Sequence, residues 1–299
     1  MKTGRSPWWH VCLSALAGFT VLVISISSGL TDRLDLSIYD FFNRLRLDKK
    51  TDSREKKSPY VSVVAITNAD VTRLDKPFPW PRDEQSVIFE KLAAYQPSVL
   101  AVDLLYAEAS SPEKDGRLAF QLAACGNVVT AFYFDESENR EAREDTSLLD
   151  RSGNRMGADF TDAKWPQFDA SPAIPNLSVS SGITRVGHAH SIPDSDGLIR
   201  SIPLVIRHGD SLYPSLSLQA VLLHWNIEWS QIHLSGNQMT IVGVPEVGTL
   251  KIPLDERGRM LVNFPEVHGN CFESSQVFSL LENPNENFPV DGRIVCVGS

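Results

Sequence analysis

The order of apolar and polar positions after residue 59 predicts strands that alternate with helices. "YVSVVAIT" (residues 60–67) and "SVLAVDLLY" (98–106) are apolar runs rich in valine, which indicates strands buried on both faces. "RDEQSVIFEKLAAYQP" (82–97) and "DGRLAFQLAAC" (115–125) have helical spacing, and "NVVTAFYF" (127–134) is a third strand. This alternation predicts an α/β fold with a mostly parallel sheet covered by helices.

The second half of the chain adds shorter elements. The pattern predicts a hairpin in "LIRSIPLVIRHGDSLYPSL" (198–216), where the turn residues "HGDS" separate two strand-like runs. Further elements are a helix in "LSLQAVLLHWN" (216–226), short strands in "QMTIVGV" (238–244), "GTLKIPLD" (248–255) and "RMLVNFPE" (259–266), a serine-capped helix in "SSQVFSLLEN" (274–283) and a buried strand in "GRIVCVGS" (292–299). The sheet is therefore expected beside an additional antiparallel hairpin region.

The N-terminal segment has a different pattern. No Asp, Glu, Lys or Arg occurs between Ser6 and Thr31, and the apolar run over residues 11–30 is long enough to cross a bilayer. Tryptophans at 8 and 9 stand where interfacial aromatic residues belong. A cleaved signal peptide is the alternative, but its apolar region is shorter and ends at a small-residue cleavage site. We favour an uncleaved transmembrane helix.

These patterns divide the chain into four parts. They are a short cytoplasmic N-terminus (1–10), a transmembrane anchor (11–30), a membrane-proximal helix with a charged linker (31–59) and an extracytoplasmic domain (60–299). Lys2 and Arg5 favour a cytoplasmic N-terminus, although basic residues beyond the anchor weaken the asymmetry. We expect a single-pass protein of the bacterial inner membrane.

The membrane-proximal helix carries an apolar stripe. Leu34, Ile38, Phe41 and Leu45 recur at helical spacing between charged residues. Such a stripe packs either on its own domain or on a second copy of the chain. We expect a homodimer.

Charge and motifs exclude several function classes. A net charge of −9 disfavours a nucleic-acid partner, which requires clustered lysine and arginine. The sequence has no Gly-x-Ser-x-Gly nucleophile elbow and no phosphate-binding glycine-rich loop. We therefore expect no cofactor, and no residue is assigned a catalytic role.

The segment "KPFPWPRDEQ" (76–85) has an unusual composition for a connector, with three prolines and two aromatic residues just before a predicted helix. Pro79 and Pro81 keep the backbone extended, and Pro81 suits the first turn of a helix. Trp80 can cover apolar surface, and Arg82 presents a fork of donors. We favour a rigid connector with an aromatic plug over a site where a ligand stacks on the tryptophan.

Polar residues near the strand ends are the candidates for ligand binding. Ligands of open α/β sheets bind at the carboxyl ends of the strands, where Asn68, Asp70 and Asp103 are expected beside Arg82. Asp103 ends an apolar run and therefore needs a partner, for which Arg82 is the candidate. The alternatives are a polar pocket for a small molecule and a structural ion pair.

"GHAHSIPDSDG" (187–197) is the stretch most similar to a metal site. His188 and His190 would share one face of a strand, with Asp194 and Asp196 close behind. The oxygen ligands of a calcium loop are incomplete, and turns of the Asx type account for both aspartates, with Gly197 permitting the turn. We favour the turn and expect no metal.

The ordered series of these segments resembles a known family. "FPWPRDEQSVIFEKLAAYQPSVLAVDLLYAE", then "GHAHSIPDSDGLIRSIPLVIRHGDSLYPSLSLQAV" and the closing "GRIVCVGS" are similar to the type-2 CHASE domain, an extracellular sensory module associated with cyclases and histidine kinases. The resemblance covers the chain from about residue 34 to residue 299. In it, "PDSDGLIR" is a turn leading into a strand, with Arg200 just after the turn.

The resemblance implies an extracytoplasmic sensory domain that binds an unknown small-molecule ligand and is not itself an enzyme. The candidate ligand-binding residues are Asn68, Asp70, Trp80, Arg82, Asp103 and Arg200. Two departures matter, since the acid that usually follows the first strand is replaced by Thr67 and Asn68, and family members normally continue into membrane spans and an effector. The alternatives are a metal-dependent hydrolase using the histidine and aspartate cluster, and a truncated receptor remnant.

Overall fold

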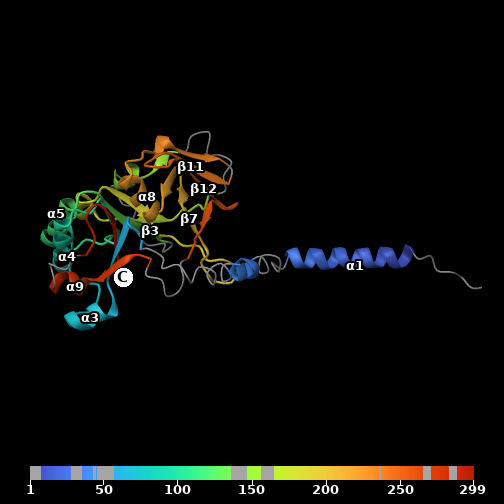
Figure 1. Ribbon diagram of the computed structural model, residues 1–299, viewed down its shortest axis with the longest axis horizontal. Coiled ribbons are helices and arrows are strands. Elements are labelled where there is room, and N and C mark those ends of the chain that lie inside the picture. Colours follow the sequence, from blue (N-terminus) through green and yellow to red (C-terminus); the bar gives the residue numbers. More distant parts are fainter. Residues whose placement is uncertain are drawn as a thin grey trace, which may run out of the picture. The chain divides into compact units, whose positions relative to one another are not determined.

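The computed structural model of the 299-residue chain describes residues 8–27, 36–42, 45, 57–135, 147–155, 165–235, 237–264, 271–282 and 288–299 (Figure 1). The chain forms two compact units. One comprises residues 1–55, 193–199 and 265–267, and the other comprises residues 56–192, 200–264 and 268–299. The larger unit carries the sheet.

The smaller unit is helical in its described N-terminal part. Helix α1 (Trp8–Ser27) covers most of the expected transmembrane anchor, of which residues 28–30 lie outside the described residues. A membrane span needs about 20 consecutive, mostly apolar residues. Among the helices that the structure describes, none is both long enough and apolar enough to cross a bilayer, so the expectation of a transmembrane helix finds no support here.

The larger unit is built on a seven-stranded sheet. Its strands follow the order β14-β1-β15-β2-β3, after which β3 pairs with both β5 and β6. The pairs are parallel except for β3 with β5. The strands are β1 (Val61–Ala65), β2 (Val99–Asp103), β3 (Val128–Asp135), β5 (Ser171–Ala173), β6 (Arg185–His188), β14 (Glu273–Gln276) and β15 (Ile294–Gly298).

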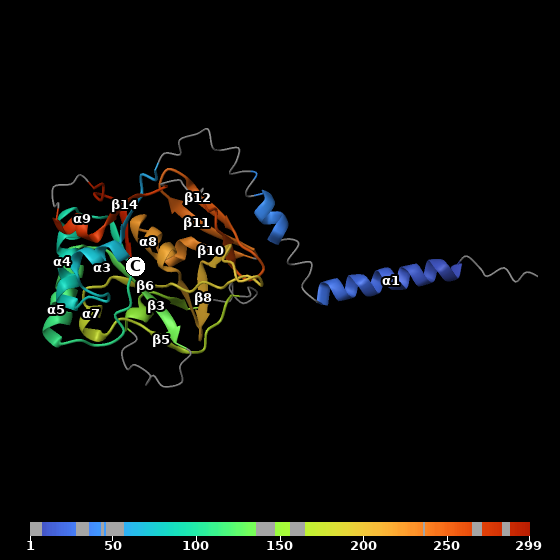
Figure 2. The same ribbon diagram turned by 90° about the horizontal axis from the view of Figure 1, so that it is seen from below.

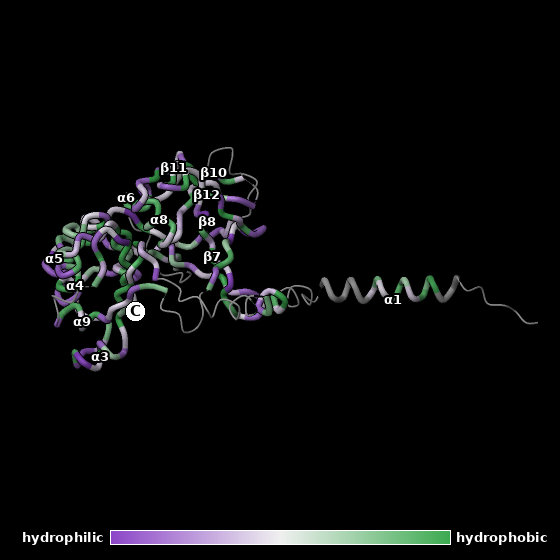
Figure 3. Tube along the Cα trace, viewed as in Figure 1, coloured by the Kyte–Doolittle hydropathy of each residue, from purple (hydrophilic) through white to green (hydrophobic). Residues whose placement is uncertain are grey.

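One face of this sheet packs on a layer of helices (Figure 2). Val64, Val102 and Val297 point into this layer and are completely or almost completely buried. Figure 3 shows hydrophilic residues on the outer side of α5, as expected for a helix that buries one stripe. The helices on or beside this face are α3 (Asn68–Leu74), α4 (Arg82–Ala94), α5 (Pro112–Ala124), α7 (Leu177–Ser180) and α9 (Val277–Glu282).

The opposite face is covered by one helix, α8 (Leu216–His224), which contacts β2, β3, β6 and β15. Ser215 caps α8, because its hydroxyl accepts a hydrogen bond from the Leu218 N–H at 3.2 Å. Ala220 of α8 packs between Ala101 and Val129 of the sheet, which places a small side chain where the helix comes close. The opposite side of α8 supports the antiparallel part of the fold.

The antiparallel part consists of three small sheets. They are β10-β11-β12, β13-β7 and β4-β9-β8. Their strands are β4 (Asn154–Arg155), β7 (Ser201–Pro203), β8 (Val205–His208), β9 (Ser211–Pro214), β10 (Ile232–Ser235), β11 (Gln238–Val244), β12 (Gly248–Pro253) and β13 (Arg259–Leu261). The short helix α6 (Ser147–Asp150) and the 3-10 turn η2 (Trp229–Gln231) lie in the connections. The predicted combination of a mainly parallel sheet with antiparallel hairpins is confirmed.

Several elements were not predicted, and α3 and β14, next to β1, are two of them. Asn68 and Asp70, which were expected at a polar rim, belong to helix α3 (Asn68–Leu74). The serine-rich start of the predicted helix over 274–283 belongs instead to strand β14, which pairs with β1 at the edge of the sheet. The helix itself begins later, at Val277.

The contact between β6 and α8 requires a glycine. A Cβ atom on Gly187 would lie 2.5 Å from the Cα of Leu216 and 2.8 Å from the carbonyl carbon of Ser215. We predict that Gly187→Ala lowers the free energy of unfolding by about 2–3 kcal/mol, because backbone must shift to admit one methyl group. Urea denaturation of the purified protein measures this change.

Gly116→Ala is the matched control. Gly116 lies inside α5, and a Cβ atom there meets nothing within 4 Å. Alanine in an exposed helix should raise stability by about 0.5–1 kcal/mol. Equal effects of the two substitutions would contradict the close approach at Gly187.

Candidate functional site

The proline-rich connector before α4 acts as a plug. Trp80 is 4% exposed, and its Nε1–H donates a hydrogen bond to the carbonyl of Lys76 at 3.1 Å. The Phe78 ring meets the tryptophan edge-on, with 5.5 Å between the centroids. The Phe78–Pro79 peptide bond is cis. The tryptophan is therefore a packed structural residue, and it also lines a cavity beside Arg82.

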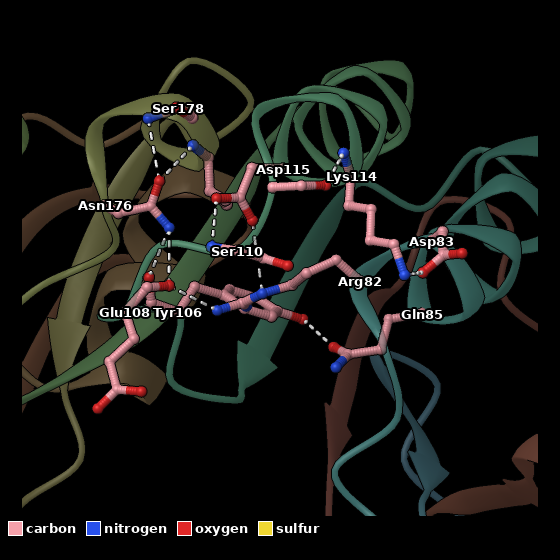
Figure 4. Close-up of polar contacts among 12 residues, drawn as sticks. Arg82, Asp83, Gln85, Tyr106, Glu108, Ser110, Lys114, Asp115, Asn176 and Ser178 are labelled. Atoms are coloured by element: carbon pink, nitrogen blue, oxygen red, sulfur yellow. Dashed lines mark hydrogen bonds and ion pairs between the residues drawn. The ribbon is translucent and has the colours of Figure 1, made fainter.

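Arg82 is the first residue of α4 and lies in a polar frame (Figure 4). Its guanidinium stacks over the ring of Tyr106, 4.4 Å from the centroid. One Nη2–H donates to the carbonyl of Glu108 at 3.0 Å, and Nε lies 3.6 Å from a carboxylate oxygen of Asp115. The arginine side chain is 14% exposed, so the site holds a partly buried positive charge.

Asp115 is the acidic partner of this arginine. Its side chain is 1% exposed, and Oδ2 accepts a hydrogen bond from the Ser110 N–H at 2.9 Å. Oδ1 has no hydrogen-bond donor among the described residues and faces Arg82. The carboxylate therefore offsets the arginine charge without using all of the guanidinium donors.

A second layer of hydrogen bonds fixes the frame. Gln85 Nε2 donates to the carbonyl of Trp80 at 2.6 Å, and the Tyr106 hydroxyl donates to Gln85 Oε1 at 2.9 Å. Burial raises the pKa of the Tyr106 phenol well above its ordinary value, so the group stays a donor. Asn176 Nδ2 donates to the carbonyls of Tyr106 and Glu108, both at 3.1 Å (Figure 4). The loop after β2 is thus held from two sides.

These groups surround a cavity of about 330 Å³. We call it the Arg82 cavity, and it lies between the start of α4 and the connection from β2 to α5. Its volume is within the range of small-molecule sites. The lining residues are Pro79, Trp80, Pro81, Arg82, Gln85, Leu105, Ala107, Glu108 and Ser110.

The other residues expected at the rim have separate roles. Asn68 is the first residue of α3. Asp70 is fully buried, and its carboxylate accepts hydrogen bonds from the Thr67 N–H at 2.7 Å and the Phe278 N–H at 2.7 Å. Asp70 therefore joins the start of α3 to the start of α9.

The expected pairing of Asp103 with Arg82 is wrong. Asp103 Oδ1 accepts a hydrogen bond from the Tyr133 hydroxyl at 3.0 Å, whereas the carboxylate beside Arg82 belongs to Asp115. The reason is the two-residue period of a strand, since Val102 points toward α4 and α5 and Asp103 points to the opposite face. Arg200 is buried, and its carbonyl accepts from the Val262 N–H at 2.9 Å.

The two histidines lie in an aromatic cluster. His190 stacks on Phe168 with 4.4 Å between the centroids, and its Nε2 accepts a hydrogen bond from the Phe134 N–H at 2.8 Å. His188 is 1% exposed, and neither ring nitrogen has a hydrogen-bond partner among the described residues. Within the same residues, no group of three or more histidine, cysteine or acidic side chains is placed to hold a metal ion.

The segment 193–199 contains a turn. Asp196 Oδ1 accepts a hydrogen bond from the Leu198 N–H at 3.1 Å, and the carbonyl of Asp194 accepts from the Gly197 N–H at 2.9 Å. Gly197 has a φ of +84°, a backbone conformation that residues with a side chain rarely adopt. These contacts account for the spacing of "PDSDG" without a ligand.

The residues that complete the Arg82 site were missed in the sequence. Asp115 stands in the first turns of an amphipathic helix, where an acid ordinarily faces water. Tyr106 and Asn176 stand in connectors, and no local pattern shows that they meet. The only available signal was Tyr106 itself, an aromatic residue just after a buried strand.

Breaking the buried pair should cost stability. We predict that Asp115→Ala lowers the free energy of unfolding by roughly 3 kcal/mol, because a mostly buried guanidinium loses its carboxylate. Asp83→Ala is the control, since the Asp83–Lys114 pair at 3.0 Å is solvent-exposed and its loss should change little. Urea midpoints of the two variants measure the difference, and similar midpoints would contradict the assignment.

Acid should destabilise the fold through His188. Burial, with a smaller effect of the His190 charge, lowers the pKa of His188 from 6.5 to about 3. Between these values the unfolded chain binds a proton that the folded chain excludes, so stability falls as the pH falls from about 6.5 to about 3, by up to ~1.4 kcal/mol per pH unit.

His188→Leu should flatten this pH dependence, which urea denaturation at a series of pH values measures. His233→Leu, at an exposed position of β10, should leave the slope in place. An unchanged slope in the first variant would mean that other groups cause the acid sensitivity.

Comparison with known proteins places the chain in a family. No curated protein and no solved structure gives a match to the chain. The sequence model of the CHASE2 domain matches residues 16–299, which is nearly the whole chain. The chain therefore belongs to the CHASE2 domain family, a family of sensory domains found in cyclases and kinases.

Proposed function

We propose that this chain is the extracytoplasmic input domain of a signal-transduction receptor of the bacterial cell membrane, whose output is a nucleotide cyclase or a kinase. CHASE2 domains are sensory, so the proposed activity is binding rather than turnover. An immunoblot of membrane fractions tests the receptor context, because a fused output requires a native product well above the 33.1 kDa of this chain.

We propose the Arg82 cavity as the ligand site, and the cavity itself is the observation that carries this assignment. It joins a partly buried guanidinium to apolar walls from Trp80 and Leu105. Arg82 uses one donor on the Glu108 carbonyl, which leaves further N–H groups for an acceptor on a ligand. A small molecule with a carboxylate or a similar acceptor group suits this arrangement.

Binding at this position would act on several elements together. The cavity is lined by the first turn of α4 and by the loop that leads from β2 to α5. A ligand that prefers one arrangement of these elements shifts their population toward it. We propose this shift as the signal.

We also propose that the receptor is a homodimer. The apolar side chains of Ile38, Phe41 and Phe42 in the helical residues 36–42 are more than half exposed. An exposed apolar stripe on a helix supports pairing with a second copy. Sedimentation of the full chain measures this directly, and a monomer at micromolar concentration would exclude it.

The ligand site is tested by thermal unfolding with small carboxylic acids and alcohols of the same carbon skeletons. We predict that at least one acid raises the Tm of the wild type by roughly 5–10 °C at a hundredfold excess over its Kd. Ser110→Trp should abolish the shift, because Ser110 is exposed at the cavity wall and an indole there fills the space.

Thr249→Trp is the control for a surface tryptophan. Thr249 lies at an exposed position of β12, outside the Arg82 cavity. The acid should stabilise this variant as it does the wild type. No stabilising acid, or a shift that survives in Ser110→Trp, would contradict the assignment.

A further inference from the structure

The sheet face beside α8 holds a second cavity, of about 550 Å³. It shares no lining residue with the Arg82 cavity. We call it the α8 cavity, because this helix forms one of its walls. The lining residues are Val61, Val63 and Ala65 of β1, Ala101 and Asp103 of β2, Ile294, Cys296, Val297 and Gly298 of β15, Leu216, Ser217, Ala220 and Val221 of α8, and Phe272 and Ser299.

The cavity exists because α8 covers part of the face. The helix packs over β2, β3 and β6 and only touches β15. Parallel sheets are ordinarily covered on both faces, since their strands are apolar on both sides. The small side chain of Ala65 in β1 and the missing side chain of Gly298 in β15 leave room beside α8.

One charged group lies in this apolar lining. Asp103 stands at the carboxyl end of β2, and its Oδ1 is held by the Tyr133 hydroxyl at 3.0 Å. Burial, with a smaller effect of the Asp103 charge, raises the pKa of Tyr133 to about 12 and that of Cys296 to about 11. Asp103 is itself exposed, so its carboxylate offers an acceptor at the open end of the apolar cavity to a hydrogen-bond donor of a ligand.

We infer that the α8 cavity binds a compact apolar ligand that carries a hydroxyl or an ammonium group directed at Asp103. The volume suits a small molecule, and the walls supply apolar contact. Asp103 supplies an acceptor and disfavours a ligand carboxylate by like-charge repulsion. This site goes beyond the proposed function, because it lies on a different face of the sheet and takes the opposite ligand charge.

The thiol of Cys296 reports on occupancy. The four cysteines of the chain carry free thiols, so Cys12→Ser, Cys125→Ala and Cys271→Ser leave Cys296 as the reactive group. The rate of its reaction with N-ethylmaleimide is followed by mass spectrometry of the full chain. Three probes share one apolar cage and differ in charge: adamantan-1-ylmethanamine, adamantan-1-ylmethanol and adamantane-1-carboxylate.

The amine and the alcohol should slow the labelling about fivefold at four times their Kd, because only the unoccupied protein reacts. The carboxylate should protect little. In Asp103→Asn the advantage of the amine over the carboxylate should disappear while the alcohol still protects. Protection is given as the ratio of the Cys296 labelling rates without and with probe, measured in the same variant. This ratio removes the direct effect of the Asp103 substitution on the reactivity of the thiol.

Two tryptophan variants locate the effect. Ser217→Trp, at an exposed position of the cavity lining, should remove protection by all probes, and Thr249→Trp, at an exposed position of β12 outside both cavities, should preserve it. Circular dichroism confirms that both variants fold. Equal protection by the carboxylate, or protection by no probe, would overturn the inference. Because the raised pKa of Cys296 alone slows its reaction in folded chain, the Tm shift caused by each probe is measured beside the labelling, and no shift with any probe would also overturn the inference.

Discussion

The sheet depends on the position of β15. This last strand lies between β1 and β2 and pairs with both in parallel, from Ile294 to Gly298. β1 in turn holds the edge strand β14. Without residues 294–298, β1 and β14 would have no hydrogen-bonded connection to the rest of the sheet. The fold therefore forms only when strands more than two hundred residues apart in sequence have met, a contact pattern that favours slow folding.

Much of this sheet could be predicted because its strands are buried on both faces. Such strands are continuous apolar runs, and the valines of β1, β2 and β15 are visible without any structure. β14 was missed because "ESSQ" is polar and pairs only at an edge, where local composition carries little information. Helix α3 did have a local signal, the capping box of Thr67 and Asp70, but its seven residues are too few for a helical period to be recognised.

The candidate site was predicted in part, because Trp80 and Arg82 belong to a segment with an unusual composition. The partner of Arg82 was assigned incorrectly, since sequence order suggests which residues are near a strand end but not which face they take. Asp103 and Asp115 are both acids close to an apolar run, and only the packed structure distinguishes them. The proline-rich connector is mainly a plug, as its buried tryptophan indicates, and its chemistry resides in the arginine that follows.

The stretch from Asp103 to Ser110 borders both cavities. Asp103 lines the α8 cavity, whereas Leu105, Ala107 and Ser110 line the Arg82 cavity. The two cavities thus share one short piece of backbone, which Asn176 and Arg82 hold through its carbonyls. A ligand that moves this stretch in one cavity changes the affinity of the other by a factor that must be the same in both directions. With the two ligands proposed above, this coupling would make the occupancy of each cavity depend on the concentration of both ligands.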